Sequence, residues 1–241
     1  MIRTTIIFYL LILHLIAGAF VLHSISPIKQ IDRLTAQLKP QRLPPAYRRM
    51  HYHFIQQSQQ LAKHNIVFIG DSLTHSYNVS NAFPYAVNFG ISGDTISGVS
   101  DRLSRYSRLA VIDSLVIMIG INDIVHENLE LQETSEAIDR LASRLPKTPT
   151  IYWRAILPIA QPRDAAKYST IITKVNAYMQ RSCATLGNCR WVKPPDKMLT
   201  EKGLLSRKYH NGDGLHLNRY AYTLLSESLM AYINETNSIN R

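Results

Sequence analysis

From position 66 onward, short apolar runs alternate with longer amphipathic stretches along the chain. The short runs predict β-strands buried on both faces, at residues 66–69, 86–89, 115–119, 150–156 and 190–192. Apolar residues at helical spacing predict helices around residues 131–145, 168–179 and 221–229. Strands that alternate with helices are typical of α/β proteins. The pattern therefore predicts a three-layer α/β/α sandwich with a five-stranded parallel sheet.

The N-terminal segment has a different pattern, because residues 6–22 contain no Lys, Arg, Asp or Glu and follow a short positive stretch. This predicts a signal peptide or a transmembrane anchor within residues 1–23. Ala17-Gly18-Ala19 fits a cleavage site, whereas the apolar run continues to Leu22 and is then long enough to span a bilayer. The continuing run favours an uncleaved membrane-associated helix, and a helix buried in the domain is the alternative.

Residues 24–63 are expected to form a basic connecting region with short helices, followed by one domain over residues 64–241. Prolines interrupt the connecting region, and its residues 46–63 have helical spacing. Met50, Phe54 and Leu61 are the candidates for packing from this helix.

The formal net charge of +10 changes the picture only for the N-terminal region. Residues 1–63 contain eight Lys or Arg and one acidic residue, whereas the remaining residues hold 19 basic and 16 acidic side chains. A nearly balanced domain without a basic stripe or a nucleic-acid-binding motif is not expected to bind nucleic acid.

The two cysteines, Cys183 and Cys189, leave two possibilities open. Without further Cys or paired His nearby they make a poor zinc site. A local disulfide can form if the domain lies outside the cytosol, and two reduced, small hydrophobic side chains near a helix end are the alternative.

Four polar motifs stand at the ends of predicted elements. They are Gly70-Asp71-Ser72, the turn at residues 90–95, the segment 120–123 and the segment 213–216. Each alone is explained as a turn or a helix cap. Because parallel strands keep their ligand crevice at their carboxyl ends, the four motifs are expected to meet in one site.

Together the motifs contain the groups needed for acyl transfer. Ser72 is a nucleophile that needs a base, His216 is that base, and Asp213 orients the imidazole and stabilises its charged form. The backbone N–H groups of Ser72 and Gly93 and the side-chain amide of Asn122 are candidate oxyanion-hole donors. One such donor contributes about 2.7–4 kcal/mol to transition-state binding.

In these motifs the chain resembles the GDSL esterase/lipase family, also called SGNH hydrolases. The four blocks, residues 68–74, 88–95, 120–123 and 213–216, occur in family order, and the resemblance covers roughly residues 65–235. Leu217 stands where members often have proline. The resemblance implies a flavodoxin-like sheet of order 2-1-3-4-5, catalysis by Ser72, Asp213 and His216, and no metal or organic cofactor.

The resemblance also implies the activity. We expect a serine esterase acting on short-chain or acetyl esters, with small-molecule, glycan or lipid esters as substrates. The alternatives are a cell-envelope acyltransferase, a thioesterase or lysophospholipase, and a non-enzymatic binding module. The N-terminal segment would place the protein at the bacterial inner membrane facing the periplasm, or in the periplasm or outside the cell after cleavage.

Other conspicuous residues are interpreted structurally. His75 and His126 are near the motifs in sequence but have no evident partner, Trp153 is expected in the core, and Asp94 and Asp123 are expected to hold turns. Trp191 is likewise expected in the core. The loop at residues 194–211 is expected to wall one side of an open, shallow cleft.

Overall fold

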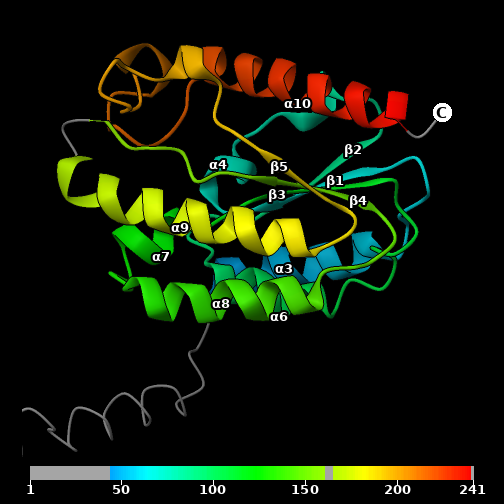
Figure 1. Cartoon of the computed structure of the whole chain (residues 1–241). Helices are drawn as coiled ribbons and strands as arrows, with labels where there is room; N and C mark the ends of the chain where they lie inside the picture. The colour runs from blue at the N-terminus through cyan, green and yellow to red at the C-terminus, as the bar shows by residue number, and fades with distance from the viewer. Residues whose placement is uncertain (1–43, 161–164, 240–241) are drawn as a thin grey trace, which may run out of the picture. The chain divides into compact units, whose positions relative to one another are not determined.

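A computed structural model describes residues 44–160 and 165–239 (Figure 1). The predicted signal peptide or membrane-associated helix at residues 1–23 lies outside the described residues. So does the connecting region up to residue 43. None of the helices in the described ranges is long and apolar enough to cross a membrane.

The sheet has five strands, all of them parallel to their neighbours. The strands are β1 (Ile66–Gly70), β2 (Ala86–Gly90), β3 (Ser114–Met118), β4 (Thr150–Arg154) and β5 (Cys189–Val192). Their order is β2-β1-β3-β4-β5, which confirms the predicted parallel sheet and its flavodoxin-like order. Strand β4 ends two residues earlier than predicted because its last pair with β5 joins Arg154 to Val192.

Helices cover both faces of the sheet and complete the predicted three layers (Figure 1). One face packs against α3 (Pro45–Ser58), α6 (Ile96–Leu103), α8 (Leu131–Arg144) and α9 (Ala165–Thr185). The other face packs against α5 (Val79–Ala82) and α10 (Arg219–Ile239). The short helices α4 (Ser72–His75) and α7 (Ile121–Val125) begin just after strands β1 and β3.

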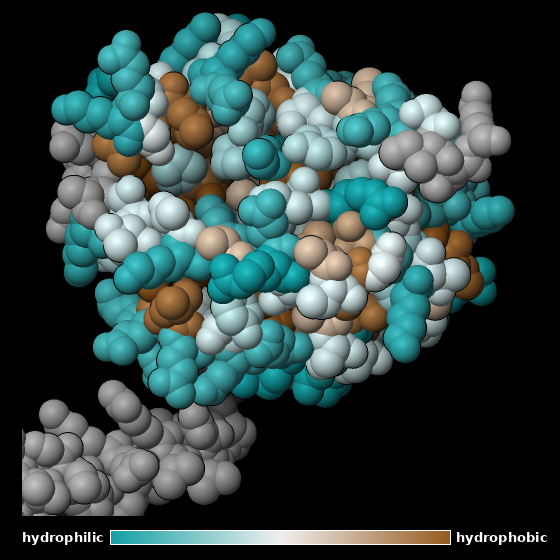
Figure 2. Space-filling model, viewed as in Figure 1, coloured by the Kyte–Doolittle hydropathy of each residue, from teal (hydrophilic) through white to brown (hydrophobic). Residues whose placement is uncertain are grey.

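The apolar runs are continuous because both faces of the central strands are buried. In β1, the side chains of Val67 and Ile69 enter one core cluster, and that of Phe68 enters the other. Leu115 and Val116 of β3 divide in the same way. The surface shown in Figure 2 is mainly hydrophilic, with apolar residues in small separate groups.

Helix α3 belongs to the same compact unit as the sheet, which begins at Pro45. Phe54 stacks on Phe89 of β2 at 4.9 Å between ring centroids, and Leu61 is also buried. Met50 is partly buried against the same cluster. All three predicted packing residues therefore contact the core. The helix ends at Ser58, earlier than the pattern predicted.

The two cysteines form a disulfide between Cys183, near the end of α9, and Cys189, at the start of β5. This decides between the two possibilities that the sequence left open. Trp153 is fully buried, as expected, and Trp191 is half-buried against the core.

Candidate active site

Ser72 lies at the carboxyl edge of the sheet because β1 stops sharply before it. Strand β1 ends at Gly70, where a Cβ atom would lie only 2.0 Å from the backbone oxygen of Met118. Asp71 then caps α4, and its carboxylate accepts a hydrogen bond from Leu73 N at 2.9 Å. As the first residue of α4, Ser72 has a backbone N–H without an intrahelical partner.

Asp213 and His216 lie on a tight turn before α10. The Asp213 Oδ1 atom accepts hydrogen bonds from Leu215 N and His216 N, both at 2.9 Å. Its Oδ2 atom lies 2.5 Å from His216 Nδ1. Partial burial acts to raise the pKa of Asp213, but hydrogen bonds from the His216 ring and the two backbone groups lower this pKa to about 2. The carboxylate is therefore ionised at neutral pH.

The same imidazole reaches the serine. His216 Nε2 lies 3.2 Å from Ser72 Oγ, across 144 residues of sequence. With the Nδ1 proton facing the Asp213 carboxylate, the Nε2 lone pair faces the hydroxyl. The structure thus brings the three predicted residues into the order serine–histidine–aspartate. Their catalytic roles stay predictions until activity is measured.

The other two candidate oxyanion donors lie in the segments that follow the neighbouring strands β2 and β3. Gly93 is exposed, with a φ of 79° that favours glycine, and its backbone N–H has no hydrogen-bond partner among the residues the structure describes. Asn122 is buried in α7 and donates one amide hydrogen to Asp94 O at 2.8 Å. A side-chain amide has two N–H groups. This bond uses one of them and orients the side chain, and the second N–H remains available as a donor.

A buried arginine that the sequence interpretation missed connects these strand ends. Arg102 Nε donates to Asp94 at 2.7 Å, and Nη2 donates to Gly70 O at 3.1 Å. Both members of the ion pair are 1% exposed. Tyr47 of α3 donates to the second Asp94 oxygen at 3.1 Å. Arg102 therefore ties the turn that ends in Ser72 to the residue that follows Gly93.

The electrostatics of this network follow from burial. Burial lowers the pKa of Arg102, but the Asp94 carboxylate and the Tyr106 hydroxyl raise it above its ordinary value. Burial also raises the pKa values of Asp71 and Asp123 to about 7, with nearby Asp94 adding to both shifts. The carboxyl of Asp123 accepts from Ile96 N and so holds the start of α6, as expected.

Asn88 is a second residue whose role sequence reasoning missed. Its amide nitrogen donates to Thr74 O at 2.7 Å and to Tyr77 O at 2.9 Å, and its oxygen accepts from Gly90 N at 2.8 Å. The side chain therefore fastens β2 to α4, the helix that begins with Ser72. Its place at the start of the second motif was the only signal.

The remaining candidate histidines are not hydrogen-bonded to the serine or to its base. His75 is exposed and contacts Gly90 O at 3.3 Å, and His126 is exposed at the end of α7. Within the described part of the chain, neither has a hydrogen bond to Ser72 or His216.

The site is open to solvent. The side chain of His216 is 42% exposed and that of Asp213 is 36% exposed. The loop at residues 194–211 lines a pocket of about 610 Å³ with residues Thr200, Glu201, Lys202, Leu204, Leu205, Arg207 and His210. Ala160 also lines this pocket and donates its N–H to Gly214 O at 2.8 Å. The pocket therefore lies next to the turn that carries Asp213, but Ser72 and His216 do not line it, so the expected cleft wall stays a prediction.

Solved structures of several bacterial proteins share this fold. A Streptococcus pneumonia protein named after platelet activating factor is 24% identical, with a TM-score of 0.68, over 83% of this chain and 98% of its own. An acetyl xylan esterase from Geobacillus stearothermophilus is 17% identical, with a TM-score of 0.57, over 70% of this chain and 94% of its own.

The catalytic domain of peptidoglycan O-acetyltransferase A from Streptococcus pneumoniae is 14% identical, with a TM-score of 0.55. The match covers 74% of this chain and 96% of that domain. None of the curated proteins matches the chain. The model of the GDSL-like lipase/acylhydrolase family matches residues 68–224, which include all four motifs. The chain therefore belongs to the GDSL-like lipase/acylhydrolase family.

Proposed function

We propose that the protein is a serine esterase that hydrolyses short-chain carboxylic esters, acetyl esters above all. The observation that carries the proposal is the line of hydrogen bonds from Ser72 Oγ through His216 to Asp213. Family membership supports an ester substrate.

In this proposal, Ser72 Oγ attacks the ester carbonyl carbon while His216 Nε2 takes the hydroxyl proton. Asp213 stabilises the imidazolium that forms. The tetrahedral oxyanion is held by the N–H groups of Ser72 and Gly93 and by the Asn122 amide. Its collapse breaks the ester C–O bond, and His216 gives the proton to the departing alcohol. Water, deprotonated by His216, then attacks the acyl-serine carbonyl carbon. The bond to Ser72 Oγ breaks, His216 returns the proton to Oγ, and the carboxylic acid leaves.

The exposure of the site favours a short acyl group on a bulky alcohol. A half-exposed His216 leaves room for a large leaving group. An acetyl xylan esterase and a peptidoglycan O-acetyltransferase have the same fold. Their names indicate that both act on acetyl groups of polysaccharides. Acetylated glycans are therefore the substrate class we favour.

The test is hydrolysis of p-nitrophenyl acetate by the full-length protein and by Ser72→Ala. We expect kcat to fall by a factor of about 10⁴ or more in the variant. Ser76→Ala is the matched control, because Ser76 is an exposed serine one helical turn away, and it should retain activity. A fluorophosphonate probe should label Ser72 alone. Equal activity of wild type and Ser72→Ala would contradict the proposal.

Transfer of the acyl group to an alcohol is the second candidate, because an open site admits an acceptor as readily as water. Incubation with p-nitrophenyl acetate and added glycan alcohols distinguishes the two. Free acetate as the sole product supports the esterase, and acetylated glycan supports the transferase. A series of acyl-chain lengths, with one thioester and one lysophospholipid, tests the remaining alternatives.

We further propose that the domain works outside the cytoplasm, held by the N-terminal segment or released after cleavage. Two observations support this: the uncharged run at residues 6–22 and the Cys183–Cys189 disulfide, a bond that persists in oxidising compartments. Alkaline phosphatase fused after residue 44 should be active in bacteria, since that enzyme is active only after export. An inactive but stably produced fusion would contradict this placement.

A further inference from the structure

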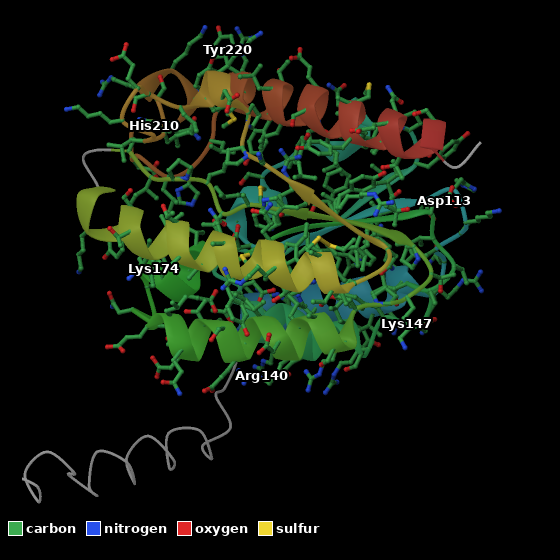
Figure 3. All side chains as sticks on the ribbon, in the orientation of Figure 1. Asp113, Arg140, Lys147, Lys174, His210 and Tyr220 are labelled. Carbon is green, nitrogen blue, oxygen red and sulfur yellow. A yellow bond between two sulfur atoms is a disulfide. The ribbon has the colours of Figure 1, made fainter. Side chains whose placement is uncertain are left out.

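The turn that carries Asp213 encloses a second histidine. His210 is 5% exposed, and its Nδ1 atom accepts hydrogen bonds from the backbone N–H of Gly212 at 3.0 Å and of Gly214 at 3.1 Å. These two residues flank Asp213 on either side. In Figure 3, His210 lies in the loop region that precedes α10.

Backbone hydrogen bonds close the turn around this ring. His210 and Leu217 form an isolated antiparallel bridge, and Asn211 N donates to His216 O at 2.8 Å. Inside the closed turn, Gly212 and Gly214 have φ values of 100° and 78°. Glycine adopts such values freely but also leaves them freely, so the turn needs contacts that hold it in one conformation.

The hydrogen bonds indicate which tautomer the neutral ring adopts. Two N–H donors point at His210 Nδ1, which must therefore present its lone pair, and the proton of the neutral ring sits on Nε2. His216 has the opposite arrangement, because its Nδ1 faces the Asp213 carboxylate. Within the described part of the chain, the buried His210 Nε2 atom has no hydrogen-bond partner.

An unpaired buried N–H group destabilises a fold, so packing alone does not explain a histidine here. An apolar side chain would fill the same space without that penalty. What an apolar side chain cannot supply is the acceptor between Gly212 and Gly214.

We infer that His210 is a positioning residue, whose imidazole fixes the Gly212-Asp213-Gly214 turn so that the Asp213 carboxylate meets His216 Nδ1. The inference rests on the proposed function, in which Asp213 orients the base. Loss of the acceptor lets the carboxylate shift, and a displacement of about 1 Å at a catalytic group reduces the rate on the order of 10²-fold.

The experiment compares His210→Asn with His210→Leu in the full-length protein. Asn places its side-chain oxygen near the position of Nδ1, and Leu has the same shape without an acceptor. We expect His210→Asn to keep kcat for p-nitrophenyl acetate within about threefold of wild type. In His210→Leu, kcat should fall on the order of 10²-fold with little change in KM. Should His210→Leu fail to fold, His210→Phe, which keeps the ring, takes its place.

A second readout needs no substrate. The hydrogen bond between His216 Nδ1 and Asp213 should give a strongly downfield proton resonance in wild type and in His210→Asn. That resonance should be shifted or lost in folded His210→Leu. Equal kcat and equal resonances in Asn and Leu variants would overturn the inference. An inactive wild type would instead refute the proposed function, while the resonance would still report on His210.

Discussion

Two pairs of polar side chains lie at the carboxyl edge of the sheet, and they differ in exposure. Asp213 and His216 are 36% and 42% exposed and are held by a loop. Asp94 and Arg102 are each 1% exposed and are held by helix α6 and the strand ends. The first set can meet a substrate, whereas the second can only hold other groups in place.

The difference in exposure predicts different roles for the two pairs. An exposed contact between two side chains contributes little to stability, so Asp213 and His216 should matter first for the proposed chemistry at Ser72. A buried pair leaves an uncompensated charge when one partner is removed, so Asp94 and Arg102 should matter first for folding. Substitutions in the two sets should therefore have opposite profiles of activity and stability.

The largest expected effect is on the exposed side. Asp213→Asn should lower kcat for p-nitrophenyl acetate about 10⁴-fold, because the amide no longer favours the required His216 tautomer. The melting temperature should change by only a few degrees. Steady-state kinetics together with thermal unfolding check this. A variant that is equally active but much less stable would reverse the comparison.

On the buried side, Arg102→Met should reduce the free energy of unfolding by about 3–5 kcal/mol, because Asp94 remains buried without its partner. Arg144→Met is the matched control. Arg144 pairs with Asp101 at 2.6 Å, but the two side chains are 43% and 77% exposed. Urea denaturation should give a loss below about 1 kcal/mol there. Similar losses in both variants would erase the distinction between buried and exposed pairs.

Asn122 is buried, as Asp94 and Arg102 are, and it is also a candidate oxyanion donor. Asn122→Ala should lower kcat by about 10²–10³, the effect of removing one oxyanion donor. Its KM should stay within a few-fold of wild type, because the oxyanion forms only in the transition state. A raised KM with unchanged kcat would assign Asn122 to substrate binding instead.

The smallest effect concerns pH. The pKa of Asp71 is raised to about 7 in the folded protein, from an ordinary 3.8. The folded state therefore holds a proton that the unfolded chain has released, and this contribution to stability is lost as pH rises from about 4 to 7. Asp71→Asn keeps the oxygen that accepts from Leu73 N. We expect its free energy of unfolding to decline less between pH 5 and pH 8.

Urea titrations of Asp71→Asn and wild type at pH 5, 6.5 and 8 measure that slope. Asp213 does not interfere, because its lowered pKa affects stability only below about pH 4. The slope should not vanish, since Asp123 has the same raised pKa. If the free energy of unfolding changed with pH equally in the two proteins, Asp71 would not be the group that holds the proton.

The sequence predicted the features that depend on residues close together in the chain. Buried strands are apolar along their whole length, and the polar motifs follow them directly, so the strands and the residues around Ser72 could be anticipated. The strand order came from the family resemblance. Strand ends moved by one or two residues because pairing with the neighbour decides them: β3 begins at Ser114, opposite Ile66.

The supporting residues could not be predicted, because their partners are distant in sequence. Arg102 contacts Gly70 across 32 residues, and Tyr47 contacts Asp94 across 47. His210 accepts from residues close in sequence, but a histidine in a loop has no pattern that distinguishes an acceptor from an exposed side chain. Asn88 was visible within a motif, yet its role depends on where α4 lies.

Helix α3 is part of the compact unit that contains the sheet, so the domain begins before the first strand. A chain cut before residue 64 would retain every strand, every motif and the complete serine–histidine–aspartate line. It would also leave Phe89 without the ring of Phe54 and Asp94 without the hydroxyl of Tyr47. We expect a peptide spanning residues 45–58 to restore these contacts when it is added to the truncated chain. The activity of the mixture should then rise with the peptide concentration and saturate.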